Sequence, residues 1–452
     1  VFSTKKEDQT YKRKIQEIML ALQLERNYSK EQILTYYLNK VYMANNVYGF
    51  GTASHYYFNK ELSELSLPQV ALLAGMPQAP NSYDPYANAD QAKERRDLVL
   101  YSMKENGKIS NEQYEQAVAT PVTEGLIAHN NNVDSNDKAL VYDSFVTMVL
   151  KEVQEKTGLD PYNDGLTIET TIDSKAQQRL YDIVNTNDYI QYVNDKIQNA
   201  VVMLDTKTGA VRAVNGGRKQ TTLLGYNRAT DNSRSTGSSI KPVIDYGPAI
   251  EYLNYSTGQT IMDQRTTYSN GVELNNWDFS HKGAMTLRTA LVYSRNTTAL
   301  QTFKAVGETN IKSFLNNLDI QIKNDGQDYL VESNSIGADI SPIKMAAAYA
   351  TFGNYGNYSK PYTVTKVTTR DGQVTEFKPE QKQAMKDSTA YMITDVLKDS
   401  FKYGFATQAT IPGLPTAAKT GSSNYTVEQK RAMGASDYED IIPDSWFIGY
   451  ST

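Results

Sequence analysis

A serine followed three residues later by a lysine can carry out nucleophilic acyl transfer, because an amine one helical turn away can accept the hydroxyl proton. This spacing occurs at Ser3, Ser135, Ser238 and Ser341, so the spacing alone says little. Order and context select one set of three motifs along the chain: Ser238-Ser239-Ile240-Lys241, Ser294-Arg295-Asn296 and Lys419-Thr420-Gly421-Ser422. Lys-Thr-Gly also occurs at Lys207, where it is typical of a hairpin turn.

The residues around Ser238 predict a helix that begins at this serine. Gly237 permits a tight entry into a helix, and Pro242 is tolerated only in a first turn. Ser238 and Lys241 then share one helical face, and the free N–H groups of the helix terminus face an incoming carbonyl group.

The base for this serine is expected to be a lysine, because the three histidines, His55, His129 and His281, are scattered along the chain. Lys241 can act as the base if burial and nearby cations lower its pKa. Lys419 is the candidate for the second cation.

The other motif residues are expected to relay the proton, stabilise the oxyanion and bind the substrate. Ser294 would relay the proton towards the leaving group, and Asn296 would hold the acyl chain. Lys419-Thr420-Gly421 fits the start of an edge strand, where glycine allows a substrate backbone to approach closely. Backbone N–H groups of Ser238 and Ser422 would form an oxyanion hole, and the hydroxyls of Thr420 and Ser422 suit a substrate carboxylate.

Hydrophobic periodicity predicts an α+β fold with helices packed on an antiparallel sheet whose edges come from both chain ends. Residues 1–118 read as a mostly helical module, 119–190 as a small α/β linker and 191–452 as the domain with the three motifs. Expected strands and hairpins lie at 166–172, 199–214, 361–377 and 445–450, and expected helices at 239–252, 285–303, 341–352 and 388–403.

Composition excludes several classes of protein. The chain has 452 residues, and 46 basic against 51 acidic residues give no support for nucleic-acid binding. The absence of cysteine excludes disulfides, zinc–thiolate sites and thiol nucleophiles. No run approaches the roughly 20 apolar residues that span a bilayer.

The three motifs and their surroundings resemble those of class A penicillin-binding proteins of streptococcal type. The likeness extends to Asn227-Arg228-Ala229, Phe352-Gly353-Asn354-Tyr355-Gly356 and Asp444-Ser445-Trp446-Phe447-Ile448-Gly449-Tyr450. Arg295 departs from the common pattern, which has aspartate there, but the functional pair Ser294 and Asn296 is kept. The resemblance implies a penicillin-binding/serine β-lactamase-like domain that cross-links peptidoglycan stem peptides ending in D-Ala-D-Ala. It further implies acylation of Ser238 by β-lactams and no metal or organic cofactor for this reaction.

Residues 1–118 resemble the C-terminal part of the peptidoglycan glycosyltransferase domain of the same family. The resemblance rests on Arg13-Lys14-Ile15-Gln16-Glu17, on residues 30–39 and on Arg95-Arg96-Asp97-Leu98. It implies that Glu17 is the second of two functional carboxylates and that the substrate is lipid II. The motif with the first glutamate is not found here, so this chain is not expected to polymerise glycan. The intact family uses a divalent cation and a membrane anchor, which we expect upstream, on the extracytoplasmic face of the membrane.

Two other readings of the acyl-transfer motifs remain open. A serine β-lactamase of class A would need a glutamate that activates the deacylating water, and no Glu-x-x-Leu-Asn segment lies between Ser294 and Lys419. A catalytically silent antibiotic sensor or scaffold would also keep the serine, although the glycosyltransferase-like module argues for a link to glycan synthesis.

Overall fold

The computed structural model describes residue 19 and residues 21–45, 47–127, 133–162, 164–220, 223–425, 427–434, 436 and 441–451. The chain divides into two compact units. One comprises Val1–Asn136 with Asp160–Gly165, and the other comprises Asp137–Leu159 with Leu166–Thr452. All three acyl-transfer motifs lie in the second unit.

The first unit is helical in its described part, as the sequence predicts. Its helices are α2 (Lys30–Lys40), α3 (Phe50–Phe58), α4 (Leu67–Gly75), α5 (Ala89–Glu105) and α6 (Asn111–Ala119). The capping box predicted at Ser29 is confirmed, since Ser29 Oγ accepts from Gln32 N–H at 3.2 Å and the Gln32 side chain accepts from Ser29 N–H at 2.9 Å. Buried residues of α3, α4 and α5, such as Tyr57, Leu72 and Ala92, form the core of this unit.

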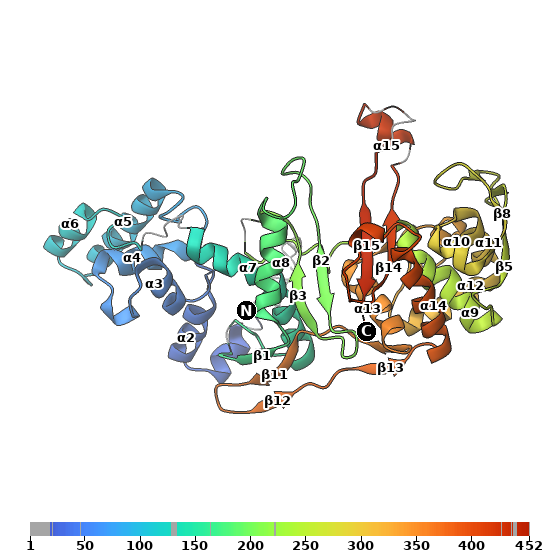
Figure 1. The fold of residues 1–452 in the computed structure, drawn as a ribbon. Coiled ribbons are helices and arrows are strands. Elements are labelled where there is room, and N and C mark those ends of the chain that lie inside the picture. Colours follow the sequence, from blue (N-terminus) through green and yellow to red (C-terminus); the bar gives the residue numbers. More distant parts are fainter. Residues whose placement is uncertain are drawn as a thin grey trace. The chain divides into compact units, whose positions relative to one another are not determined.

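The second unit contains most of a long helix, α7, followed by another helix and short antiparallel strands (Figure 1). These elements are α7 (Val133–Thr157), β1 (Thr167–Thr170), α8 (Ser174–Asn185), β2 (Val201–Leu204) and β3 (Val211–Asn215). Strand β1 pairs with β11 (Val364–Thr368), which pairs with β12 (Val374–Glu376). Buried side chains of α7, β3 and β11, including Phe145, Val214 and Val367, pack together in one apolar core.

The hairpin predicted over residues 199–214 is confirmed. Strands β2 and β3 pair antiparallel, from Val201 opposite Asn215 to Leu204 opposite Val211. The turn between them is fixed by Asp205, whose Oδ1 accepts from the backbone N–H groups of Lys207 and Thr208. Lys207-Thr208-Gly209 is therefore a turn, as its composition indicates.

Helices surround a second apolar core in the rest of this unit, which holds the motifs. They are η3 (Gly237–Ile240), η4 (Pro242–Tyr246), α9 (Gly247–Leu253), α10 (Leu287–Val292), α11 (Asn296–Val306), α12 (Glu308–Asn317), η5 (Glu332–Ser335), α13 (Pro342–Gly353) and α14 (Asp387–Lys398). Short strand pairs connect them: β4 (Arg234–Ser235) with β9 (Asp339–Ile340), β5 (Thr260–Asp263) with β8 (Gly283–Thr286), β6 (Thr266–Thr267) with β7 (Glu273–Leu274), and β10 (Asn357–Ser359) with β13 (Gln381–Gln383).

The last hairpin carries the third motif. Strand β14 (Ala417–Ser422) pairs antiparallel with β15 (Ser445–Tyr450), so that Lys419 lies opposite Ile448. Figure 1 shows the two strands side by side, with the segment that carries α15 (Val427–Ala432) extending beyond them. Helices α13 and α14 contact this hairpin, and η3 contacts the edge of β14. The β2–β3 and β14–β15 hairpins form separate ladders in the described residues.

Candidate active site

Ser238 lies in the short turn η3, directly against the end of strand β14. Gly237 has φ +51°, and a Cβ atom there would lie 2.2 Å from the carbonyl oxygen of Ser422. A Cβ atom on Gly421 would lie 2.3 Å from the carbonyl oxygen of Thr236. Because real Cβ contacts are never this short, glycine is required at both positions to bring β14 against the Ser238 turn.

The chain continues from Ser238 into a helix whose first turns are irregular. The backbone N–H of Lys241 donates to the carbonyl of Ser238, and that of Gly247 reaches back five residues to Pro242. Lys241 and Pro242 therefore sit in the first turn, as the sequence predicts, but residues 242–246 form a π-turn rather than regular α-helix. Such turns often occur at functional sites.

Lys241 is fully buried, and its amine contacts the second motif. Its Nζ donates to the carbonyl oxygen of Ser294 at 2.7 Å, to Asn296 Oδ1 at 2.7 Å and to the carbonyl oxygen of Arg295 at 3.2 Å. The Ser294 hydroxyl lies 3.4 Å from the same nitrogen. The structure thus brings the first two motifs together around one amine.

The second motif forms a sharp corner between two helices. The periodicity of the sequence predicts one helix over 285–303, and this prediction is wrong, because α10 ends at Val292 and α11 begins at Asn296. Ser294 has φ +55°, a left-handed conformation that a non-glycine residue adopts only when its surroundings enforce it. The corner turns the Ser294 hydroxyl towards the two lysines.

Lys419 completes the group from strand β14. Its Nζ donates to the Ser294 hydroxyl at 2.9 Å and to the carbonyl oxygen of Thr420 at 2.9 Å. Ser294 Oγ therefore lies between two amines that come from distant parts of the chain. The close approach of Gly237 to the Ser422 backbone brings Ser422 beside Ser238. Thr420 is half-buried, and its backbone carbonyl accepts a hydrogen bond from Lys419.

The pKa values of both lysines are lowered. Burial, the positive charge of Lys419 and that of Arg295 hold the pKa of Lys241 well below its ordinary value, against an opposing effect of Asp245. Burial lowers the pKa of Lys419 to about 7. A lowered pKa favours the neutral amine, and a neutral amine is the form that a serine needs as a base.

A buried ionic network holds the corner of the second motif, and neither a motif nor the periodicity of the sequence predicts it. Arg295 is 2% exposed; its Nε donates to Asp263 at 2.8 Å and its Nη1 to Asp278 at 2.9 Å. Asn276 accepts from the backbone N–H of Asn296 at 2.7 Å and donates to Asp263 at 2.7 Å. Burial raises the pKa of Asp263, but hydrogen bonds and the Arg295 charge outweigh it, so the pKa is lowered. Arg295 thus anchors the corner between Ser294 and Asn296.

Arg295→Ala is expected to lower the free energy of unfolding by about 3–5 kcal/mol, because it leaves the buried Asp263 carboxylate without its cation. Denaturant unfolding measures this change. Arg234→Ala is the matched control. The Arg234 side chain is 50% exposed, so its ion pair with Asp444 should contribute at most about 1 kcal/mol to the free energy of unfolding. Equal losses in the two variants would contradict the anchoring role.

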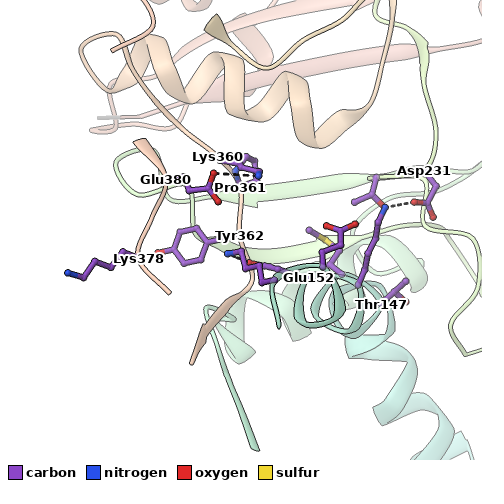
Figure 2. Close-up of a pocket in the computed structure, with 13 residues that line it drawn as sticks. Thr147, Glu152, Asp231, Lys360, Pro361, Tyr362, Lys378 and Glu380 are labelled. Carbon is purple, nitrogen blue, oxygen red and sulfur yellow. Dashed lines mark hydrogen bonds and ion pairs between the residues drawn. The ribbon is translucent and has the colours of Figure 1, made fainter. Parts of the chain in front are cut away.

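A cavity of about 310 Å³ lies in the second unit, away from the three motifs (Figure 2). Glu152 of α7, Asp231 and the segment Lys360 to Tyr362 line it, and Lys360 pairs with Glu380 at 3.5 Å. None of the motif side chains contributes to its lining. The acyl-transfer chemistry therefore belongs to the Ser238 site and not to this cavity.

Other predicted features fall outside this site. Glu17 lies outside the described residues. In the part of the chain that the structure describes, no group of three or more His, Cys, Asp or Glu residues could hold a metal ion. None of the described helices combines the length and apolar character that crossing a bilayer requires.

Both modules of the chain match known protein families. Residues 199–452 match the penicillin-binding protein transpeptidase domain, and residues 1–104 match the transglycosylase family. The chain is 43% identical to penicillin-binding protein 1A of Streptococcus oralis, over all of this chain and 71% of that protein. It is 44% identical to penicillin-binding protein 1A of Streptococcus pneumoniae (strain ATCC BAA-255 / R6), over all of this chain and 63% of that protein.

Solved structures show the same fold at low sequence identity. Penicillin-binding protein 1A from Haemophilus influenzae superposes with a TM-score of 0.58 at 21% identity, over 88% of this chain and 78% of that one. PonA1 from Mycobacterium tuberculosis in complex with penicillin V gives a TM-score of 0.56 at 23% identity, over 69% of this chain and 81% of that one. The chain therefore belongs to the class A penicillin-binding proteins, which carry a transglycosylase domain and a penicillin-binding transpeptidase domain.

Proposed function

We propose that the Ser238 site is a D,D-transpeptidase that cross-links peptidoglycan stem peptides through an acyl-enzyme on Ser238. The observation that carries the proposal is the convergence of Lys241, Ser294 and Lys419, which donate to or accept from one another within 3.4 Å beside the Ser238 turn. Nucleophile, base and proton relay are all side chains of this chain, so the proposed reaction requires no cofactor.

In the first half-reaction, neutral Lys241 takes the hydroxyl proton while Ser238 Oγ bonds to the penultimate D-Ala carbonyl carbon. The backbone N–H groups of Ser238 and Ser422 stabilise the oxyanion. The bond to the terminal D-Ala then breaks, and its nitrogen receives a proton through the Ser294 hydroxyl, which lies between Lys241 and Lys419. In the second half-reaction an amine of a neighbouring stem peptide attacks the ester, and Ser238 recovers its proton.

The substrate contacts follow from the groups left available around these atoms. Asn296 uses Oδ1 to hold Lys241 and one amide hydrogen to reach the Asn275 carbonyl at 2.8 Å, so its second amide hydrogen can hold the acyl chain. Lys419 and the hydroxyls of Thr420 and Ser422 suit the terminal carboxylate of the substrate or of a β-lactam. Gly421 admits the substrate backbone along the edge of β14.

The proposed function is tested with a stem peptide that ends in D-Ala-D-Ala and an amine acceptor such as a D-amino acid. We expect release of one D-Ala for each acyl transfer and a product that contains the acceptor. Release without incorporation of the amine would indicate a hydrolase, and the absence of release would contradict the proposed reaction.

The pH dependence of acylation tests the role of Lys419, whose positive charge attracts a substrate carboxylate. Its pKa is lowered to about 7, so the charge is present below this pH and is lost as the pH rises through it. The second-order rate constant for acylation by penicillin, which reports the free enzyme, should therefore fall above about pH 7. In Lys419→Arg the falling limb should move up by more than about one pH unit, because a guanidinium group stays charged.

Lys207→Arg is the matched control for this profile, because Lys207 begins the other Lys-Thr-Gly, an exposed hairpin turn. Its profile should equal that of the unchanged protein. An alkaline limb that stays in place in Lys419→Arg would contradict the assignment to Lys419.

We further propose that the whole protein joins lipid II into glycan through the transglycosylase module, on the extracytoplasmic face of the cell membrane. The match of residues 1–104 to the transglycosylase family supports this second activity. Glu17 is the proposed carboxylate of this module within the present sequence. The two activities would act on the same growing polymer, one on its sugars and one on its peptides.

A further inference from the structure

The Arg234–Asp444 ion pair joins the two segments whose backbones meet at Ser238. Arg234 lies in β4, four residues before Ser238, and Asp444 directly precedes β15. The Arg234 Nε donates to Asp444 Oδ1, and its Nη2 donates to Asp444 Oδ2 at 3.1 Å. A guanidinium group that binds both oxygens of a carboxylate fixes the orientation of the two side chains as well as their distance.

Asp444 also binds the residue that follows β14. The Ser423 hydroxyl donates to Asp444 Oδ2 at 2.8 Å, and the Ser423 backbone N–H donates to the Asp444 carbonyl oxygen at 3.1 Å. Ser422, the last residue of β14, pairs with Ser445, the first residue of β15. The Asp444 carboxylate therefore bonds to the segment that leads into Ser238 and also to the neighbour of Ser422.

This ion pair is the polar link between the two segments. Among the described residues, the only hydrogen bonds that join residues 234–241 to the β14–β15 hairpin (417–423 and 444–450) are the two that Arg234 donates. The other contacts between these segments are packing contacts, including the close approach at the two glycines. Packing limits how near the two backbones can come, whereas the ion pair adds a directional attraction between them.

The distance between these backbones matters for the proposed reaction, because the Ser422 N–H is one of its two oxyanion donors. Such a donor is effective when it lies about 2.7–3.1 Å from the oxyanion, and a displacement of about 1 Å can slow a reaction about 100-fold. The Arg234 side chain is 50% exposed, so the ion pair adds little to the stability of the fold. Its geometry is what it can contribute.

We propose that Arg234 and Asp444 are positioning residues for acyl transfer, which hold the Ser422 N–H beside Ser238 so that both backbone donors face the oxyanion. The inference rests on the proposed function, in which the Ser422 N–H stabilises that oxyanion. Both side chains act through the backbone of Ser422, and neither is required to bind the substrate or to move a proton.

The test compares Arg234→Ala with the unchanged protein by stopped-flow measurement over a range of concentrations of a fluorescent penicillin. This separates the first-order rate constant of acylation from the dissociation constant of the preceding non-covalent complex. We expect the rate constant to fall at least about fivefold and the dissociation constant to change less than about threefold, because the oxyanion hole acts mainly on the transition state. The melting temperature should fall by less than about 4 °C, since the ion pair is exposed.

A double-mutant cycle assigns the effect to the ion pair. Asp444→Ala should also slow acylation, and the double variant should be no slower than the slower single variant, because the first substitution already removes the pair. Asp444→Asn, which keeps an acceptor for Ser423, replaces the alanine variant if that variant does not fold.

Lys386→Ala is the matched control, because its ion pair with Glu251 has a similar exposure and involves none of the motif residues. The side chains of Lys386 and Glu251 are 55% and 12% exposed, against 50% and 17% for Arg234 and Asp444. This variant should acylate at the rate of the unchanged protein.

A smaller fall of the rate constant in Arg234→Ala, a larger fall of its melting temperature, additive losses in the cycle or an equal loss in Lys386→Ala would overturn the proposal. An unchanged protein that fails to acylate at Ser238 would instead overturn the proposed function itself.

Discussion

Ser238→Ala is expected to abolish acylation by penicillin, with a loss of at least about 10⁴-fold in the rate constant, because no other group at the site can form the ester bond. The variant should fold normally. Ser238 is half-buried, and its hydroxyl takes part in no hydrogen bond within the described residues. Its removal should therefore change the free energy of unfolding by less than about 0.5 kcal/mol. Labelling with a fluorescent penicillin and thermal unfolding measure the two quantities.

Ser341→Ala is the matched control for this experiment, because Ser341 begins another Ser-x-x-Lys segment of the same domain. It lies at the N-terminus of α13 and is buried. Its replacement should leave the acylation rate within about threefold of the unchanged protein, since surrounding groups do not make it a nucleophile. Loss of labelling in Ser341→Ala with retention in Ser238→Ala would show that the wrong motif was selected.

Lys241→Arg is expected to slow acylation by about 10³-fold, the loss associated with a missing general base. Arginine keeps the positive charge but is not deprotonated in proteins, so it cannot accept the Ser238 proton. The variant therefore separates the charge at this position from basicity. Stopped-flow measurement of adduct formation gives the rate constant.

Lys344→Arg is the corresponding control, because Lys344 ends the Ser-x-x-Lys segment that begins at Ser341 and is exposed. It should acylate at the rate of the unchanged protein. A Lys241→Arg variant with more than about a tenth of the normal rate would mean that the serine is activated by another group, of which Lys419 is the nearest candidate by its contact with Ser294.

The parts of the structure that depend on local sequence could be predicted. The Ser29 capping box, the turn at Asp205 and the helical first turn around Lys241 each follow from the preferences of a few neighbouring residues, and the structure confirms them. The family was identified from motifs for the same reason, since three short segments in a fixed order specify it. The assignment of individual roles at the site remains a prediction.

The parts that depend on long-range contacts could not be predicted. The helix expected over 285–303 is broken at Ser294, because the buried pairing of Arg295 with Asp263 and the contact of Asn276 with Asn296 N–H stabilise a left-handed corner. No periodicity within the segment carries that information. The same holds for the complete burial of Asp245, because a single acidic residue in a helix is usually exposed.

The sequence predicts a role for each glycine between β14 and the Ser238 turn, but not the close approach of the two segments. The sequence predicts that Gly237 allows entry into a helix and that Gly421 allows a substrate backbone to approach. The structure adds that each glycine also makes room for the other segment, since Cβ atoms would collide with the carbonyls of Ser422 and Thr236. The two motifs are therefore joined by backbone contact, which residue types alone do not reveal.

Peptide mass spectrometry of the protein treated with penicillin shows whether Ser238 forms a long-lived acyl-enzyme. The protein is incubated with penicillin, the adduct is located by peptide mass spectrometry, and its decay is followed. We predict a single adduct on Ser238 that persists far longer than it takes to form. Rapid decay with steady penicillin turnover would indicate a β-lactamase, and an adduct on another residue would contradict the role of Ser238 as the nucleophile.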